Sequence, residues 1–153
     1  MVIMRKIIIL QLAVAAWFCL QPASELRAQN DLNRIQGLLE SSMAKQTILT
    51  ENDVKTYLAH SESIYLLRFD PARVDEVIKE TGWTGDRFAY VTTKMAVGMS
   101  VLLRPDDPRN RSIPSFAQPS GVEKSIIMRY QEALDRTMEQ VQARHAPSPA
   151  AGG

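Results

Sequence analysis

The chain has 153 residues, with 18 Lys and Arg against 17 Asp and Glu, and a formal net charge of +1 at pH 7. This length fits one domain. The near-neutral charge argues against nucleic-acid binding through bulk charge, which requires a surplus of basic residues. A single cysteine excludes a disulfide framework and a metal site built from cysteines alone. We therefore expect no nucleic-acid partner and no cofactor.

Residues 1–28 have the pattern of an export signal. Arg5 and Lys6 precede an apolar run over residues 7–20, which only Gln11 interrupts, and Pro22 follows it. At roughly 14 residues, the run matches the apolar region of a signal peptide and is too short for the ~30 Å hydrocarbon core of a bilayer. We expect the protein to be exported, to a periplasm or out of the cell.

Three fates of this segment follow from the residues around it. Cleavage after Ala28 is the first expectation, and cleavage after Ala23 is an alternative. An uncleaved segment would instead tether the protein to a membrane. Lipidation of Cys19 is disfavoured, because Phe18 precedes it where a small residue is required. Cleavage after Ala28 leaves a cysteine-free, slightly acidic chain held together by its core alone.

Five helical segments are predicted between the signal and the tail, over residues 31–44, 51–69, 71–81, 85–103 and 121–145. Thr50 with Asp53, and Ser120 with Glu123, have the spacing of capping boxes at two helix starts. Gly82 is placed to end the third segment in a left-handed conformation. The end of the second segment, 64–69, also suits a short strand, but no partner strand is found in the sequence.

The fourth segment is predicted to lie at the centre of the fold. Large apolar side chains line one of its faces and small ones another, so neighbouring helices can approach it on two sides. Residues 104–119 then form a proline-rich loop, long enough to be either functional or disordered. Ile113 and Phe116 are candidates to pin it to the helices. We predict an all-α fold, a small four- or five-helix bundle over 29–145, with a disordered tail over 146–153.

No cluster of residues in the sequence is typical of a catalytic or metal-binding site. His60 and His145 are the only histidines, too few for a zinc site in a mature chain without cysteine. Asp106 and Asp107 lack the spacing of a calcium loop. No motif of a hydrolase, a phosphate-binding loop or a dinucleotide fold occurs. We therefore predict no catalytic, cofactor-binding or metal-binding residue.

The expected function is non-catalytic binding of a protein or peptide in the cell envelope, through an apolar groove near the methionine-bearing helices. The candidate partner-binding residues are Trp83, Arg87, Met95, Met99 and Phe116. Two alternatives remain open. One is a small envelope enzyme that uses His60 with a nearby carboxylate such as Glu62, and the other is a membrane-tethered structural protein. The sequence does not indicate the oligomeric state.

Overall fold

The computed structural model describes residues 26–145. The apolar run of the predicted export signal and the predicted disordered tail lie outside these residues. Within them the chain forms seven α-helices and no strand, which confirms the all-α class. None of the helices in this part of the chain is long and apolar enough to span a membrane. The α-helices are α2 (Leu26–Met43), α3 (Glu51–Ala59), α4 (Ser61–Leu66), α5 (Val74–Thr81), α6 (Gly85–Leu103), α7 (Gly121–Arg129) and α8 (Gln131–His145).

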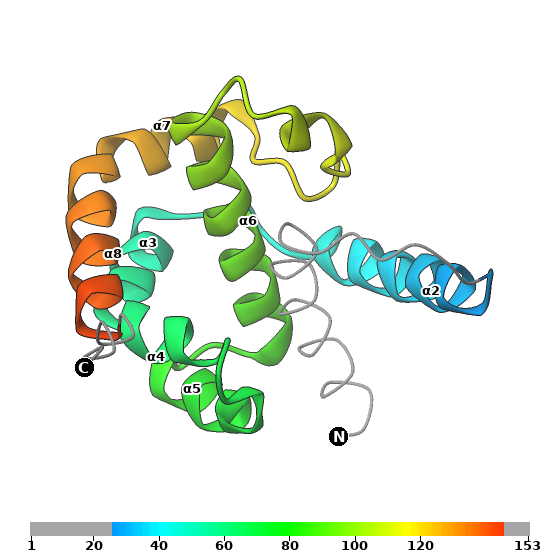
Figure 1. The fold of residues 1–153 in the computed structure, drawn as a ribbon, viewed down its shortest axis with the longest axis horizontal. Coiled ribbons are helices and arrows are strands. Elements are labelled where there is room, and N and C mark those ends of the chain that lie inside the picture. The colour runs from blue at the N-terminus through cyan, green and yellow to red at the C-terminus, as the bar shows by residue number, and fades with distance from the viewer. Residues whose placement is uncertain (1–25, 146–153) are drawn as a thin grey trace, which may run out of the picture.

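Helix α6 runs through the middle of the molecule (Figure 1) and packs against α2, α3, α5 and α7. The side chains of Met95 and Val91 on α6 are fully enclosed in the main core. Gly98 lets α6 approach α7 closely, because a Cβ built there would overlap the Cδ1 of Ile127. This arrangement agrees with the central position that its small residues predict.

Two of the five predicted helices are each divided in the structure. His60 separates α3 from α4, and Tyr130 separates α7 from α8, both with backbone angles outside the helical range. The chain turns sharply at the second break, where α8 descends beside α3 and α4 (Figure 1). A single non-helical residue redirects the axis without ending the run of apolar residues. Periodicity along the sequence therefore predicted continuous helices at both places, and that prediction was wrong.

The local signals at other helix ends agree with the structure. Both predicted capping boxes are present, on Thr50 and on Ser120. Thr84 caps α6, and Gly82 ends α5 with a φ of 72°, a conformation that favours glycine. The segment 64–69 is not a strand, since it continues α4 to Leu66 and then turns.

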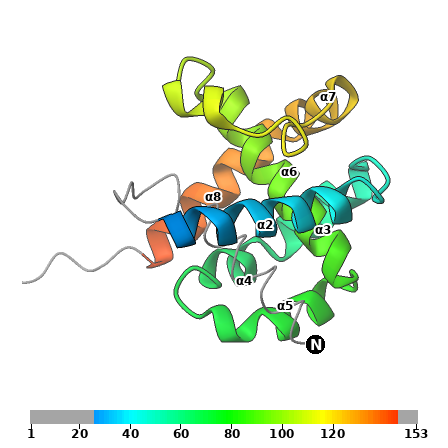
Figure 2. The ribbon, with the colours of Figure 1, turned by 90° about the vertical axis from the view of Figure 1, so that its right-hand side faces the viewer.

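Helix α2 extends away from the other helices in Figure 1 and crosses the front of the molecule in Figure 2. Near its C-terminal end, the buried side chains of Leu39 and Met43 pack into the main core. The helix begins at Leu26, five residues before the predicted start at Asp31. The predicted cleavage point after Ala28 therefore lies inside the first turn of α2, and cleavage there would shorten α2 at its free end.

Residues 104–119, which we call the strap, connect α6 to α7 and contain the 3-10 helix η2 (Pro108–Ser112). A second 3-10 helix, η1 (Pro71–Arg73), leads into α5. Ile113 is buried against Val97 of α6, and Phe116 packs on both this small cluster and the main core. The two residues expected to pin the strap therefore do contact the helices.

Candidate functional site

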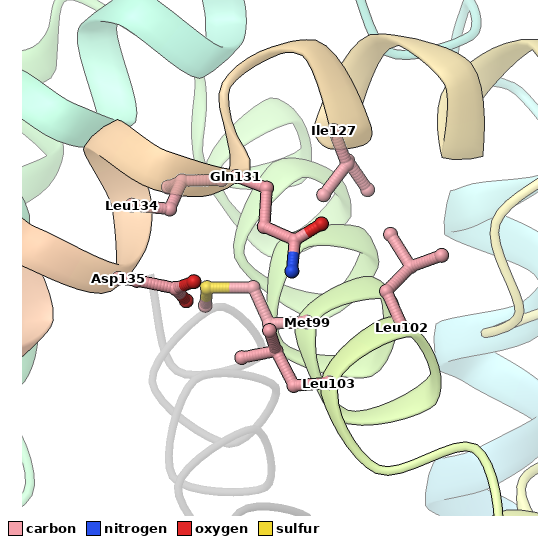
Figure 3. Close-up of a pocket in the computed structure, with 7 residues that line it drawn as sticks. All are labelled: Met99, Leu102, Leu103, Ile127, Gln131, Leu134 and Asp135. Carbon is pink, nitrogen blue, oxygen red and sulfur yellow. The ribbon is translucent and has the colours of Figure 1, made fainter.

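A shallow apolar crevice lies where the end of α6 meets the break between α7 and α8 (Figure 3). Its free volume is about 10 Å³, room for about one water molecule. Ile127 and Leu134 form a fully buried floor, while Leu103 on one wall is 44% exposed. We call this the α6–α8 crevice, and its lining residues are Met99, Leu102, Leu103, Ile127, Gln131, Leu134 and Asp135.

Two polar side chains border the apolar lining. Gln131 extends across the crevice toward α6, and the thioether of Met99 points toward Asp135 (Figure 3). Among the described residues, the amide of Gln131 and the carboxylate of Asp135 form no side-chain hydrogen bond or ion pair. Ligand pockets in proteins are usually clefts of about 300–1,000 Å³, so the crevice is small for a ligand site.

The five candidate partner-binding residues do not lie on one surface. Met99 lines the α6–α8 crevice, whereas Met95 is fully buried in the core. Phe116, a residue of the strap, is partly buried against the main core. Trp83 is partly buried between the main core and a second cluster of buried residues, Leu67, Val74, Val77, Ile78 and Phe88. The crevice therefore brings Met99 together with residues of α7 and α8 that the sequence did not single out.

Arg87, the fifth candidate, is occupied inside the protein. Its guanidinium forms an ion pair with Asp53 and donates to the carbonyl oxygens of Thr47, at 2.5 Å, and Ile48, at 3.2 Å. The central carbon of the Arg87 guanidinium also lies 5.1 Å from the centre of the Tyr90 ring. These contacts fix the segment before α3 against α6, and they leave little of the guanidinium free for a partner.

A second polar network is centred on Glu123, which is 1% exposed. Its carboxylate accepts hydrogen bonds from the Tyr90 hydroxyl at 2.5 Å and from the backbone N–H groups of Leu49 and Ser120 at 3.0 and 2.7 Å. Lys94 lies 3.8 Å away and completes the charge balance. The network joins α6, α7 and the segment before α3.

Lys94 also holds the strap. Its ammonium donates to the carbonyl oxygens of Phe116 at 2.9 Å and Gln118 at 2.6 Å. Among the described residues no buried side-chain nitrogen or oxygen lacks a hydrogen-bond partner. Because its donors and acceptors are used internally, this network positions helices.

The pKa values of these groups reflect burial opposed by specific partners. Burial raises the pKa of Glu123, but the hydrogen bonds from Tyr90, Leu49 and Ser120 outweigh it and leave that pKa below its usual value. For Asp53, burial is likewise outweighed, chiefly by the hydrogen bond from Arg87, so its pKa is also lowered. Burial lowers the pKa of the Lys94 ammonium. Both carboxylates are therefore stabilised in the charged form.

Sequence reasoning missed most of these residues. Asp53 and Glu123 were identified only as capping residues, and Tyr90 carried no signal. One clue was available: a lysine in the nearly continuous apolar part of a central helix requires a buried partner, because an unpaired buried charge is costly. Lys94 is such a residue, and Glu123 is the carboxylate beside it.

The two histidines differ in their surroundings, since His145 contacts the carboxylate of Glu62 and His60 does not. Glu62 pairs with Arg144 at 2.7 Å and with His145 at 2.8 Å, at the contact of α4 with α8, and not with His60. In the described part of the chain, the side chain of His60 has no hydrogen-bond or ion-pair partner. No group of three His, Cys, Asp or Glu side chains there could hold a metal ion.

Comparisons with known proteins add no further constraint. No protein-family model, no curated protein and no solved structure matches the chain. The functional argument therefore rests on the residues themselves and starts from the apolar lining of the α6–α8 crevice.

Proposed function

We propose that this protein is a non-catalytic, exported binding protein that engages a peptide or protein segment at the α6–α8 crevice. The observation that carries the proposal is the exposed apolar wall over a buried apolar floor, bordered by two polar groups without side-chain partners. Met99 suits such a site, since its unbranched side chain can adapt to different ligand shapes. No comparable observation favours the enzyme that would use His60.

The rest of the proposed architecture follows from the sequence. A signal segment over residues 1–28 directs export, and a compact bundle of four or five main helices presents the crevice. In this scheme α3 with α4, and α7 with α8, each count as one broken helix. Mass spectrometry of the purified protein tests the export step, since a chain beginning near Gln29 supports cleavage. A chain retaining the apolar segment supports a membrane tether instead.

Binding is tested with an array of synthetic 12-residue peptides that vary in charge and apolar content. Leu103→Ser removes an exposed wall of the crevice, while Val122→Ser makes a similar change at an exposed position outside the crevice lining. We expect Leu103→Ser to weaken peptide capture and Val122→Ser to leave it unchanged. Capture that both variants retain in full would contradict the proposed site.

A further inference from the structure

We infer that Glu62 and His145 form a proton-dependent contact, which holds the end of α8 against α4 more tightly when the imidazole is charged than when it is neutral. Nε2 of His145 lies 2.8 Å from Oε1 of Glu62, across 83 residues of sequence. The two side chains are 30% and 40% exposed, so solvent protons reach the contact. The pair lies at the α4–α8 contact and is independent of the proposed binding function.

The last turn of α8 is held by a small set of contacts. Val141 is the last buried side chain of the helix, since residues 142–144 are exposed and His145 is half-buried. Among the described residues, the hydrogen bonds and ion pairs that join this turn to α4 are those to Glu62, from Arg144 at 2.7 Å and from His145. A helix end with few buried apolar contacts opens at low cost in free energy, so one polar contact changes how often it opens.

The charge of His145 determines the strength of its contact with Glu62. Histidine is the side chain that ordinarily gains and loses charge between about pH 5 and 8. Glu62 stays ionised in this range, because the hydrogen bond from His145, supported by the charge of Arg144, holds the pKa of that carboxyl below its usual value. A charged imidazole forms an ion pair with the carboxylate, whereas a neutral one forms only a hydrogen bond. The free carbonyl groups at the end of α8 also favour a positive charge on its last residue.

The other groups around His145 keep their charge in this range. From α4, Tyr65 faces His145, with 6.2 Å between the two ring centres, and the guanidinium of Arg68 lies 5.4 Å from the centre of the Tyr65 ring. On α8, Arg144 binds the same carboxylate of Glu62. Helices α3 and α7 also pack on α8, and none of their described residues forms an ion pair with His145. Because arginine stays protonated, His145 is the group at this contact whose charge changes.

The pH dependence of this contact is opposite to that of the buried carboxylates. Protonation of His145 strengthens the contact, so the end of α8 is held more firmly as the pH falls from about 8 to 5, and this stabilisation is lost as the pH rises again. The pKa values of Asp53 and Glu123 lie below their usual values, because hydrogen bonds to each carboxylate outweigh its burial, so these groups take up protons only in stronger acid. The α4–α8 contact therefore tightens before acid weakens the interior.

The test is a double-mutant cycle of Glu62→Gln and His145→Gln, with urea unfolding measured at pH 5.5 and at pH 8. The cycle separates the coupling of the two side chains from the effect of each substitution alone. We expect the coupling to change the unfolding equilibrium constant about threefold at pH 5.5, as for a partly exposed ion pair, and to approach onefold at pH 8. Amide hydrogen exchange in the last turn of α8, compared between the natural protein and Glu62→Gln at each pH, measures the same loss locally.

Arg144 provides the matched control, because it binds the same carboxylate from the neighbouring position and keeps its charge. A cycle of Glu62→Gln with Arg144→Gln should give the same coupling at both pH values. His60→Gln, which changes the other histidine, should leave the pH dependence of the Glu62–His145 coupling unaltered. Equal coupling of Glu62 and His145 at the two pH values would overturn the inference. No coupling at either pH, together with unchanged hydrogen exchange, would overturn it as well.

Discussion

The ammonium of Lys94 lies 3.8 Å from the carboxylate of Glu123, and neither side chain is more than 9% exposed. The pair connects α6 to the start of α7, and through Phe116 and Gln118 it also holds the strap. Buried pairs of this kind are costly to break, because removing one partner leaves the other charge uncompensated.

Glu123→Ala should lower the free energy of unfolding by about 3–5 kcal/mol, the range for breaking a buried ion pair. The loss is large because Lys94, the Tyr90 hydroxyl and two backbone N–H groups lose the same acceptor. Urea unfolding followed by circular dichroism measures it. Glu132→Ala is the control: it breaks an exposed pair and should change stability by less than about 1 kcal/mol. Equal losses in the two variants would contradict the structural role of Glu123.

Acid should destabilise the protein through Glu123 and Asp53. Both have folded-state pKa values below their ordinary values of 4.5 and 3.8. Their contribution is therefore complete above the ordinary values and is lost as the pH falls toward the lowered folded-state values. Unfolding free energies measured from pH 6 to pH 3 should fall steeply below pH 4.5 in the natural protein. Glu123→Gln should show a shallower fall, and an unchanged slope would contradict this assignment.

Gly98→Ala and Gly37→Ala should have opposite effects, although both positions lie within helices. At Gly98 the new methyl group would overlap Ile127, and overpacking of this kind costs about 1–3 kcal/mol. At Gly37 no atom lies within 4 Å of the new methyl group, so alanine should raise the helicity of α2. Thermal unfolding and far-ultraviolet circular dichroism measure these effects. Adding Ile127→Val should recover part of the loss at Gly98, and failure to recover would contradict the proposed overlap.

Lys94→Met should loosen the strap. The carbonyl oxygens of Phe116 and Gln118 lose their charged donor, so the segment should open more often. Trypsin cleavage after Arg109 and Arg111 reports the opening, and we expect it to accelerate at least about tenfold, since hydrogen bonds to charged groups are worth roughly 1.5–3 kcal/mol each.

Ser100→Ala is the matched control for the strap. It removes one neutral hydrogen bond, from Ser100 to Asn110, and should accelerate cleavage far less than Lys94→Met. Hydrogen exchange of residues 104–119 distinguishes local opening from global unfolding, because global unfolding would also expose the amides of α6. Cleavage at the rate of the natural protein in Lys94→Met would show that the hydrogen bonds from Lys94 do not hold the strap.

The parts of the fold that could be predicted from the sequence are those determined by neighbours in the chain. Thr50, Ser120 and Gly82 form caps whose partners lie within a few residues. The breaks at His60 and Tyr130 could not be predicted, because tertiary contacts decide them. The Tyr130 hydroxyl, for example, donates a hydrogen bond at 3.2 Å to the carboxylate of Glu51, which lies 79 residues earlier in the chain.

The residues of the candidate site also divide into those that the sequence could indicate and those that depend on tertiary contacts. Met99, which the methionine content of its helix makes a candidate, lines the crevice, and its part in binding stays a prediction. Gln131 and Asp135 were not predicted, because the break at Tyr130 determines where the start of α8 lies relative to α6. The Glu123 network was equally hidden, since its bond to the Leu49 N–H spans 74 residues. Spacing in the sequence carries no information about such contacts.

The capping boxes have a consequence for the order of folding. Asp53 caps α3 and pairs with Arg87, while Glu123 caps α7 and pairs with Lys94, so both caps depend on cations of α6. Because each capping side chain also binds a cation on α6, the start of its own helix is stabilised together with the packing of that helix against α6. Mutational analysis of folding rates should therefore give Asp53 and Glu123 similar φ-values, although they lie in different halves of the chain.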